Sequence, residues 1–206
     1  GRLRDARSGR LPDPRLRKAF LWVVVSTTGG LLAVLIVGIL SYIAPFNPFT
    51  VSGFAGGQFA YGGLFGLLVA MPQAILIRRA GIPRWRWILF TALGFSMAVF
   101  VGISAEAIVP QLRNPLGYMI DGLAMGMWVG LAQWLAIGRY LDRPLLWPAV
   151  SGIAWGISLG IGRLLMGLTI LGSGLLYGLL TAYPFAVLVG PGDRSGLEKD
   201  SAAPFA

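Results

Sequence analysis

Two glutamines lie inside apolar segments that contain few other polar side chains. Gln73 belongs to "GGLFGLLVAMPQAILIRR" (62–79), and Gln133 belongs to "GLAMGMWVGLAQWLAIGR" (122–139). Hydrocarbon offers an amide no hydrogen-bond partner, so each amide must find one within the protein. Two interpretations follow: the amides join helices as structural hydrogen bonds, or they line a path for a polar substrate. Pro72, which would kink its helix and free backbone carbonyl groups, keeps the second interpretation open.

Ionisable side chains form a second candidate site, because three of them lie within apolar segments at a similar depth: Glu106, Asp121 and Arg163. At about 1.5 Å per residue, they lie about 24–28 Å from the other ends of those segments. Charges inside a membrane usually pair or face a cavity, and they are functional candidates by default. We expect Arg163 to pair with Glu106 or Asp121, with Arg113 just above. The alternatives are a structural ion pair, a contact to a ligand or partner, and a proton-coupled step.

The absent residue types exclude several chemistries. The chain has no cysteine and no histidine, which removes thiolate metal sites, an imidazole base, histidine-ligated haem and a serine–histidine pair. We find no phosphate-binding loop and no pair of carboxylates on one helix face. The sequence therefore predicts neither an enzyme nor a bound metal or cofactor.

The elements that must position these residues are membrane helices. Of 206 residues, 56% are hydrophobic and 12% are charged, and the mean hydropathy is +0.73. Soluble domains carry about twice that charged fraction, and apolar runs of about 20 residues suffice to cross a bilayer. The sequence predicts an all-α integral membrane protein with a transmembrane domain over residues 17–190. Its six spans are predicted at about 20–44, 56–79, 86–109, 117–139, 145–166 and 170–190.

The arginines and lysines predict the orientation of these spans. They concentrate in the arm 1–16, between the second and third spans, between the fourth and fifth, and in the polar tail 191–206. With six spans these segments share one side, and positive charge accumulates in the cytoplasm. Both termini are therefore expected to be cytoplasmic. The net charge of +9 indicates contact with anionic headgroups rather than nucleic acid. Tryptophans at the same ends are expected to mark the inner interface: Trp22, Trp85, Trp87 and Trp147.

An internal repeat links the even-numbered spans. Residues 61–79 and 121–139 align without gaps, and 170–190 carries a weaker copy. The shared glycines fall on one helical face: Gly62, Gly66, Gly122, Gly126, Gly174 and Gly178. The odd-numbered spans repeat as well, so the sequence predicts three parallel hairpins about a pseudo-threefold axis. We expect the glycines to pack the even-numbered spans together around that axis, where the two amides would meet each other or nearby carbonyl groups.

The string "GMWVGLAQWLAIGR", followed by a short basic loop and a span that begins with tryptophan, carries a resemblance. It resembles uncharacterised bacterial multi-pass membrane proteins with repeated glycine-rich Q-W-x-x-[LI]-x-R hairpins, over about residues 56–166. The chain departs from that pattern at Pro72, Ala74 and Gly138. The resemblance implies the bacterial inner membrane and no activity.

Three functions fit these observations. The first is a structural or accessory membrane subunit that packs against a larger complex, lipids or copies of itself. The second is a small-solute transporter or substrate-capture subunit. The third is a protein that binds a quinone, a pigment or a lipid between its helices.

Overall fold

A computed structural model describes residues 13–43, 54–79, 81–108, 114–141, 143–164 and 169–188. They form six long helices and one short 3₁₀ helix, η4, and no strand occurs among them. The bounds are α1 (Pro14–Ile43), α2 (Phe54–Arg79), α3 (Arg84–Ile108), α4 (Pro115–Ile137), η4 (Gly138–Tyr140), α5 (Leu146–Leu164) and α6 (Thr169–Leu188). The all-helical prediction is confirmed. The terminal segments 1–12 and 189–206 lie outside the described residues.

Length and surface composition make this a helical membrane protein. Four helices are long and apolar enough to cross a bilayer: Pro14–Leu40, Gly57–Arg79, Arg84–Gly102 and Pro115–Tyr140. The described parts of α5 and α6 are shorter apolar helices, Leu146–Gly162 and Gly174–Val187. Large apolar side chains such as Leu35, Ile75 and Leu135 are more than half exposed. A water-soluble bundle would bury such residues, whereas hydrocarbon solvates them.

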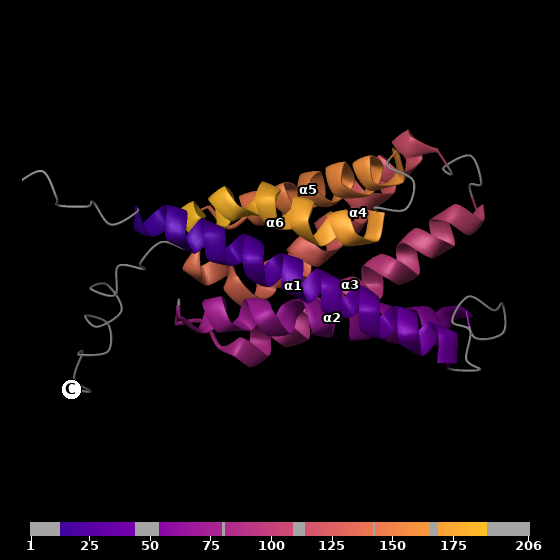
Figure 1. Ribbon diagram of the computed structural model, residues 1–206, viewed down its shortest axis with the longest axis horizontal. Helices are drawn as coiled ribbons and strands as arrows, with labels where there is room; N and C mark the ends of the chain where they lie inside the picture. The colour runs from indigo at the N-terminus through magenta and orange to yellow at the C-terminus, as the bar shows by residue number, and fades with distance from the viewer. Residues whose placement is uncertain are drawn as a thin grey trace, which may run out of the picture.

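The helices form a closed ring in which each one contacts the two beside it in sequence, and α6 closes the ring against α1. The most extensive contacts join α2 to α3, α4 to α5 and α6 to α1. Figure 1 shows the start of α1 and the end of α6 at the same end of the bundle. The fold is therefore three close pairs, and the last pair joins the two ends of the described chain.

The glycine face of each even-numbered helix packs against an odd-numbered helix. A Cβ atom added to Gly62 would lie 2.5 Å from the carbonyl oxygen of Phe95 on α3, and one added to Gly126 would lie 2.5 Å from that of Ser151 on α5. On α6, a Cβ atom at Gly174 would lie 3.2 Å from the Cα atom of Gly30 on α1. The prediction that the glycines pack even-numbered helices against one another is wrong. Described residues of α2, α4 and α6 make no close backbone contact with each other, because an odd-numbered helix separates each two of them in the ring.

The remaining predicted glycines also lie close to odd-numbered helices. A Cβ atom at Gly66 would lie 2.9 Å from the Thr91 carbonyl oxygen, and one at Gly122 would lie 2.7 Å from that of Trp155. At Gly178 the nearest atom is the Ser26 Cβ, at 3.1 Å. Close backbone approach is what small residues allow in membrane helices.

Two local features set the ends of the helices. Gly81, with φ of 80°, occupies the left-handed conformation in the tight turn between α2 and α3, and its N–H donates to the Arg78 carbonyl oxygen at 2.9 Å. Asn114 caps α4, because its side-chain oxygen accepts the Gly117 N–H at 2.9 Å and Pro115 follows directly. The turn brings Ile82 back over the bundle, where it is buried.

Candidate functional site

Three tryptophans fill the centre of the bundle near one end. Trp22, Trp87 and Trp147 lie near the starts of α1, α3 and α5, and each side chain is 0% exposed. Their ring centroids are 6.0, 6.1 and 6.4 Å apart, with interplanar angles of 71°, 75° and 61°. These are edge-to-face contacts, which aromatic rings prefer. Packing against each other removes all three from the surface, so they do not contact headgroups as interface tryptophans would, whereas Trp85 is 62% exposed.

Each predicted glutamine hydrogen-bonds the helices on both sides of it. Gln73 Oε1 accepts the Trp87 indole N–H at 3.3 Å, and Gln73 Nε2 donates to Ser26 Oγ at 3.0 Å. Gln133 repeats both contacts one pair further along. Its Oε1 accepts the Trp147 indole N–H at 3.0 Å, and its Nε2 donates to Thr91 Oγ1 at 3.3 Å.

The two amides therefore do not meet each other or a backbone carbonyl group, contrary to expectation. Their partners are side chains, because the ring places an odd-numbered helix between α2 and α4. The spacing was visible in the sequence, since each tryptophan follows its glutamine by 14 residues. What was missed is that the tryptophan is the partner of the amide, and that Ser26 and Thr91, four residues after Trp22 and Trp87, accept the amide N–H groups.

A hydroxyl group takes the place of the amide in the third pair. The Trp22 indole N–H donates to Thr181 Oγ1 at 2.8 Å, and Thr181 Oγ1 donates to the Tyr177 carbonyl oxygen at 2.6 Å. Thr181 donates within its own helix, whereas each glutamine donates to a second neighbouring helix. Phe185 covers this pair by stacking on Trp22, with ring centroids 3.8 Å apart.

Further along the bundle, α5 and α6 bury a group of polar atoms. The Ser158 hydroxyl group and the Trp155 indole N–H make no hydrogen bond within the described part of the chain. Ser151 and Tyr177 are neighbours across the two helices, and the Trp155 and Tyr177 rings lie 5.2 Å apart. Buried donors without a partner cost free energy unless a water molecule or another polar group pairs with them.

Of the predicted charged cluster, the structure describes one side chain. The Asp121 carboxylate lies against α3, where a Cβ atom at Gly102 would be 3.2 and 3.3 Å from its two oxygens. Glu106 belongs to α3 and Arg163 to α5, but their side chains lie outside the described residues, as does Arg113 entirely. The pairing of Arg163 with an acidic group stays a prediction.

The described residues contain no group of three or more acidic, histidine or cysteine side chains placed to hold a metal ion. Comparison of the chain with protein-family models, with curated proteins and with solved structures finds no match. The function must therefore be inferred from this geometry alone.

Proposed function

We propose that this chain is a non-enzymatic scaffold or accessory subunit of the bacterial inner membrane, which packs against other membrane proteins, lipids or copies of itself. One observation carries the proposal: the polar side chains at the bundle centre satisfy one another. Gln73 and Gln133 use both a donor and an acceptor on neighbouring helices. Three indole rings in mutual contact fill the axis beside them. Such a layer holds helices together, and it uses the amide and indole groups of Gln73, Gln133, Trp87 and Trp147 in bonds between helices.

The same layer supports a pseudo-threefold arrangement of six spans. A tryptophan on an odd-numbered helix donates to an amide or hydroxyl group on its even-numbered partner in each of the three close pairs. The structural unit in this proposal is an even-numbered helix followed by an odd-numbered one, with α6 and α1 as the third unit. That pairing lets the chain ends close the ring.

Charge supports cytoplasmic termini. The bundle end that holds the tryptophan cluster carries the exposed or half-buried cations of the described chain near helix ends: Arg15, Arg17, Lys18, Arg78, Arg79, Arg84, Arg86, Arg139 and Arg143. Asp13 is the acidic residue described among them. A segregation of this kind orients membrane proteins with the basic side in the cytoplasm and favours contact with anionic headgroups.

Single cysteines test the orientation, because the chain has no cysteine of its own. We expect Lys18→Cys and Arg79→Cys to resist a membrane-impermeant maleimide applied to intact cells. Tyr42→Cys and Leu116→Cys, whose native side chains are 93% and 66% exposed near the opposite ends of their helices, should react. Reaction at Lys18→Cys together with protection at Tyr42→Cys would reverse the proposed orientation.

Purification of the tagged chain in mild detergent tests the scaffold function. We expect either a membrane protein in a fixed ratio to the chain or a defined homo-oligomer, and deletion of the chain should lower the amount of that partner in the membrane. A monodisperse monomer whose deletion changes no other membrane protein would contradict the proposal.

The buried polar group on α5 and α6 favours a second candidate, a solute-capture or transport subunit. Ser158 and Trp155 offer a hydroxyl and an N–H group that no described residue uses, and the Ser151 and Tyr177 hydroxyl groups lie beside each other across the two helices. On this reading, Ser158→Ala and Tyr177→Phe lower retention of a small polar solute by the purified chain. On the scaffold reading, the same variants change thermal stability alone.

A further inference from the structure

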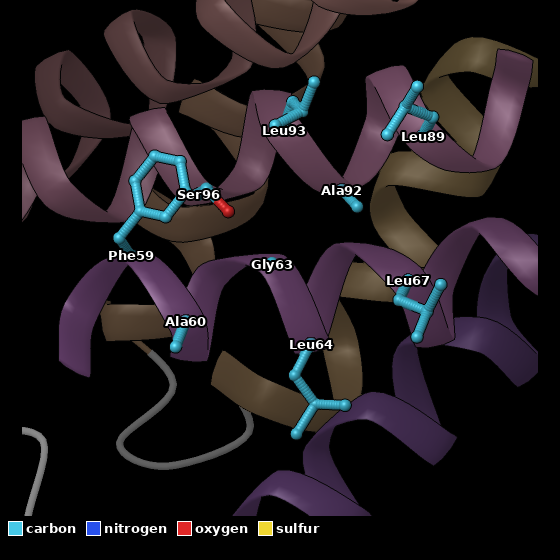
Figure 2. Close-up of a pocket in the computed structure, with 9 residues that line it drawn as sticks. All are labelled: Phe59, Ala60, Gly63, Leu64, Leu67, Leu89, Ala92, Leu93 and Ser96. Carbon is cyan, nitrogen blue, oxygen red and sulfur yellow. The ribbon is translucent and has the colours of Figure 1, made fainter. Parts of the chain in front are cut away.

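An apolar groove lies on the outside of the α2–α3 pair. Its volume is about 320 Å³, near the lower end of the range of about 300–1,000 Å³ that is usual for ligand sites. Small residues meet at its centre: Gly63 from α2, with Ala92 and Ser96 from α3 (Figure 2). Larger apolar side chains flank them, among them Leu67 and Leu89. The groove opens outward, toward the acyl chains of a bilayer.

The matching place on the α4–α5 pair is filled. Sixty residues further along the chain, Leu123 replaces Gly63 and Gly156 replaces Ser96. The Leu123 Cβ lies 3.4 Å from the position of a Cβ atom at Gly156. Met127 likewise places its Cγ 2.7 Å from the position of a Cβ atom at Gly152. Side chains of α4 thus pack against glycines of α5. In the α2–α3 pair, Gly63 of α2 faces small residues of α3, and the space between them stays open.

The groove ends at a basic aromatic cluster. Trp85 lies one helical turn before Leu89 on the same face of α3 and is 62% exposed. The Arg86 guanidinium carbon lies 5.6 Å from the centroid of the Trp85 ring, and the exposed Arg84 flanks it. From Trp85 to Ser96 the helix rises about 16 Å, close to half of the hydrocarbon thickness of about 30 Å. On α3 the groove itself runs from Leu89 to Ser96, about 10 Å of this rise, so it lies within one leaflet when the tryptophan and arginine are at headgroup depth.

We propose that this groove binds one acyl chain of an anionic phospholipid from the leaflet on the basic side, with the phosphate at Arg84 and Arg86. Charge selects this occupant: a headgroup of net negative charge complements the two guanidinium groups, and the apolar groove excludes a polar tail. The inference deepens the proposed function, since it names a lipid partner, and it rests on that proposal for placing the helices across a bilayer.

Lipid titration of the purified full chain tests the inference. The delipidated chain in detergent is titrated with phosphatidylglycerol or with phosphatidylcholine of the same acyl chains, and bound lipid is counted by native mass spectrometry. We expect tighter binding of phosphatidylglycerol. The double variant Gly63→Leu/Ser96→Gly reproduces the filled arrangement of the α4–α5 pair, and it should weaken binding of both lipids by about tenfold, equivalent to about 1.4 kcal/mol.

A charge variant separates the headgroup from the tail. Arg84→Gln/Arg86→Gln should weaken phosphatidylglycerol binding by about fivefold for each charge removed and phosphatidylcholine binding by less, because the choline cation offsets the charge of its phosphate. Arg139→Gln/Arg143→Gln removes two charges from the α4–α5 turn as a matched control and should leave both lipids bound as before. If Gly63→Leu/Ser96→Gly does not fold, Ala92→Leu obstructs the groove from α3 alone.

Three outcomes would overturn the inference. The first is that Gly63→Leu/Ser96→Gly binds phosphatidylglycerol as tightly as the wild-type chain does. The second is that the wild-type chain binds the two lipids equally. The third is that Gly63→Leu/Ser96→Gly converts a dimer to a monomer. The last outcome would make a second copy of the chain the occupant. A detergent micelle has no sides, and native mass spectrometry counts the lipid on the chain whether or not another protein is bound to it, so a reversed orientation or a missing complex would leave the lipid result intact.

Discussion

The α2–α3 and α4–α5 pairs agree on their inner faces and differ on their outer faces. Inside, Gln73 with Trp87 and Gln133 with Trp147 make the same hydrogen bond. Outside, the α2–α3 pair has a groove at Gly63, and the α4–α5 pair fills the matching place with Leu123. Hydrogen bonds and ring contacts at the centre tolerate few alternatives, because an unpaired amide in an apolar core is costly. The outer face meets fluid lipid, so one pair can acquire a groove without loss of the fold.

Removal of a central tryptophan should have the largest effect and should affect both pairs alike. We expect Trp87→Ala and Trp147→Ala each to lower the free energy of unfolding by about 3–5 kcal/mol, since each leaves a cavity and an unpaired amide oxygen. Unfolding by dodecyl sulfate in mixed micelles, followed by circular dichroism, measures this. Trp85→Ala, at an exposed position, is the control and should change stability by less than about 0.5 kcal/mol. Equal losses at Trp85 and Trp87 would contradict the central cluster.

Adding one carbon atom to the glycine face should come next. Gly62→Ala and Gly126→Ala would each place a Cβ atom 2.5 Å from a carbonyl oxygen on the partner helix, and we expect a loss of about 1–3 kcal/mol. Gly38→Ala is the matched control, because no atom of the described chain lies within 4 Å of its added Cβ. That variant should be neutral or stabilising by up to about 1 kcal/mol, from helix propensity. Similar melting temperatures for Gly126→Ala and Gly38→Ala would show that the glycine face is not a packing surface.

Loss of an amide should cost less than loss of a ring. Gln133→Leu removes two interhelical hydrogen bonds, each worth about 0.6–1.7 kcal/mol in membrane proteins, and leaves the Trp147 indole N–H unpaired. We expect a loss of about 1–3 kcal/mol and a matching loss for Gln73→Leu, measured by the same titration. If these amides lined a substrate path instead, either variant would keep its stability and lose a bound solute.

Loss of the hydrogen bond in the third pair, α6–α1, should lower the stability least. Thr181→Val removes the acceptor of the Trp22 indole N–H and nearly preserves side-chain volume, so the expected loss is about 0.6 kcal/mol, the mean for one interhelical hydrogen bond. Thermal unfolding in detergent, compared with Gln133→Leu, measures it. A larger loss than that of Gln133→Leu would mean that the α6–α1 pair depends on its hydrogen bond more than the amide-bridged pairs do.

The helices, their membrane-spanning character and the two buried glutamines could be predicted from the sequence. The length of an apolar run and an amide within it can both be read from one segment of the chain. The role of Trp22, Trp87 and Trp147 was missed. Tryptophan at the end of a span is usual at a membrane interface, and the same position can face inward when neighbouring helices supply rings and acceptors. The groove was missed because it depends on Gly63 of α2 facing Ser96 of α3, a pairing that neither segment shows alone.

By itself, the sequence determined that six apolar helices form and that glycines and glutamines recur on shared faces. The spacing of residue types along one helix and the composition of that helix are enough to predict these features. Which helix each face meets was decided by the tertiary structure. Closure of the ring by α6 and α1 turned the glycine face of each even-numbered helix toward an odd-numbered neighbour and brought three distant indoles to one axis. The physical reason is that such contacts depend on which backbones can approach most closely, and that is a property of pairs of helices rather than of any single one.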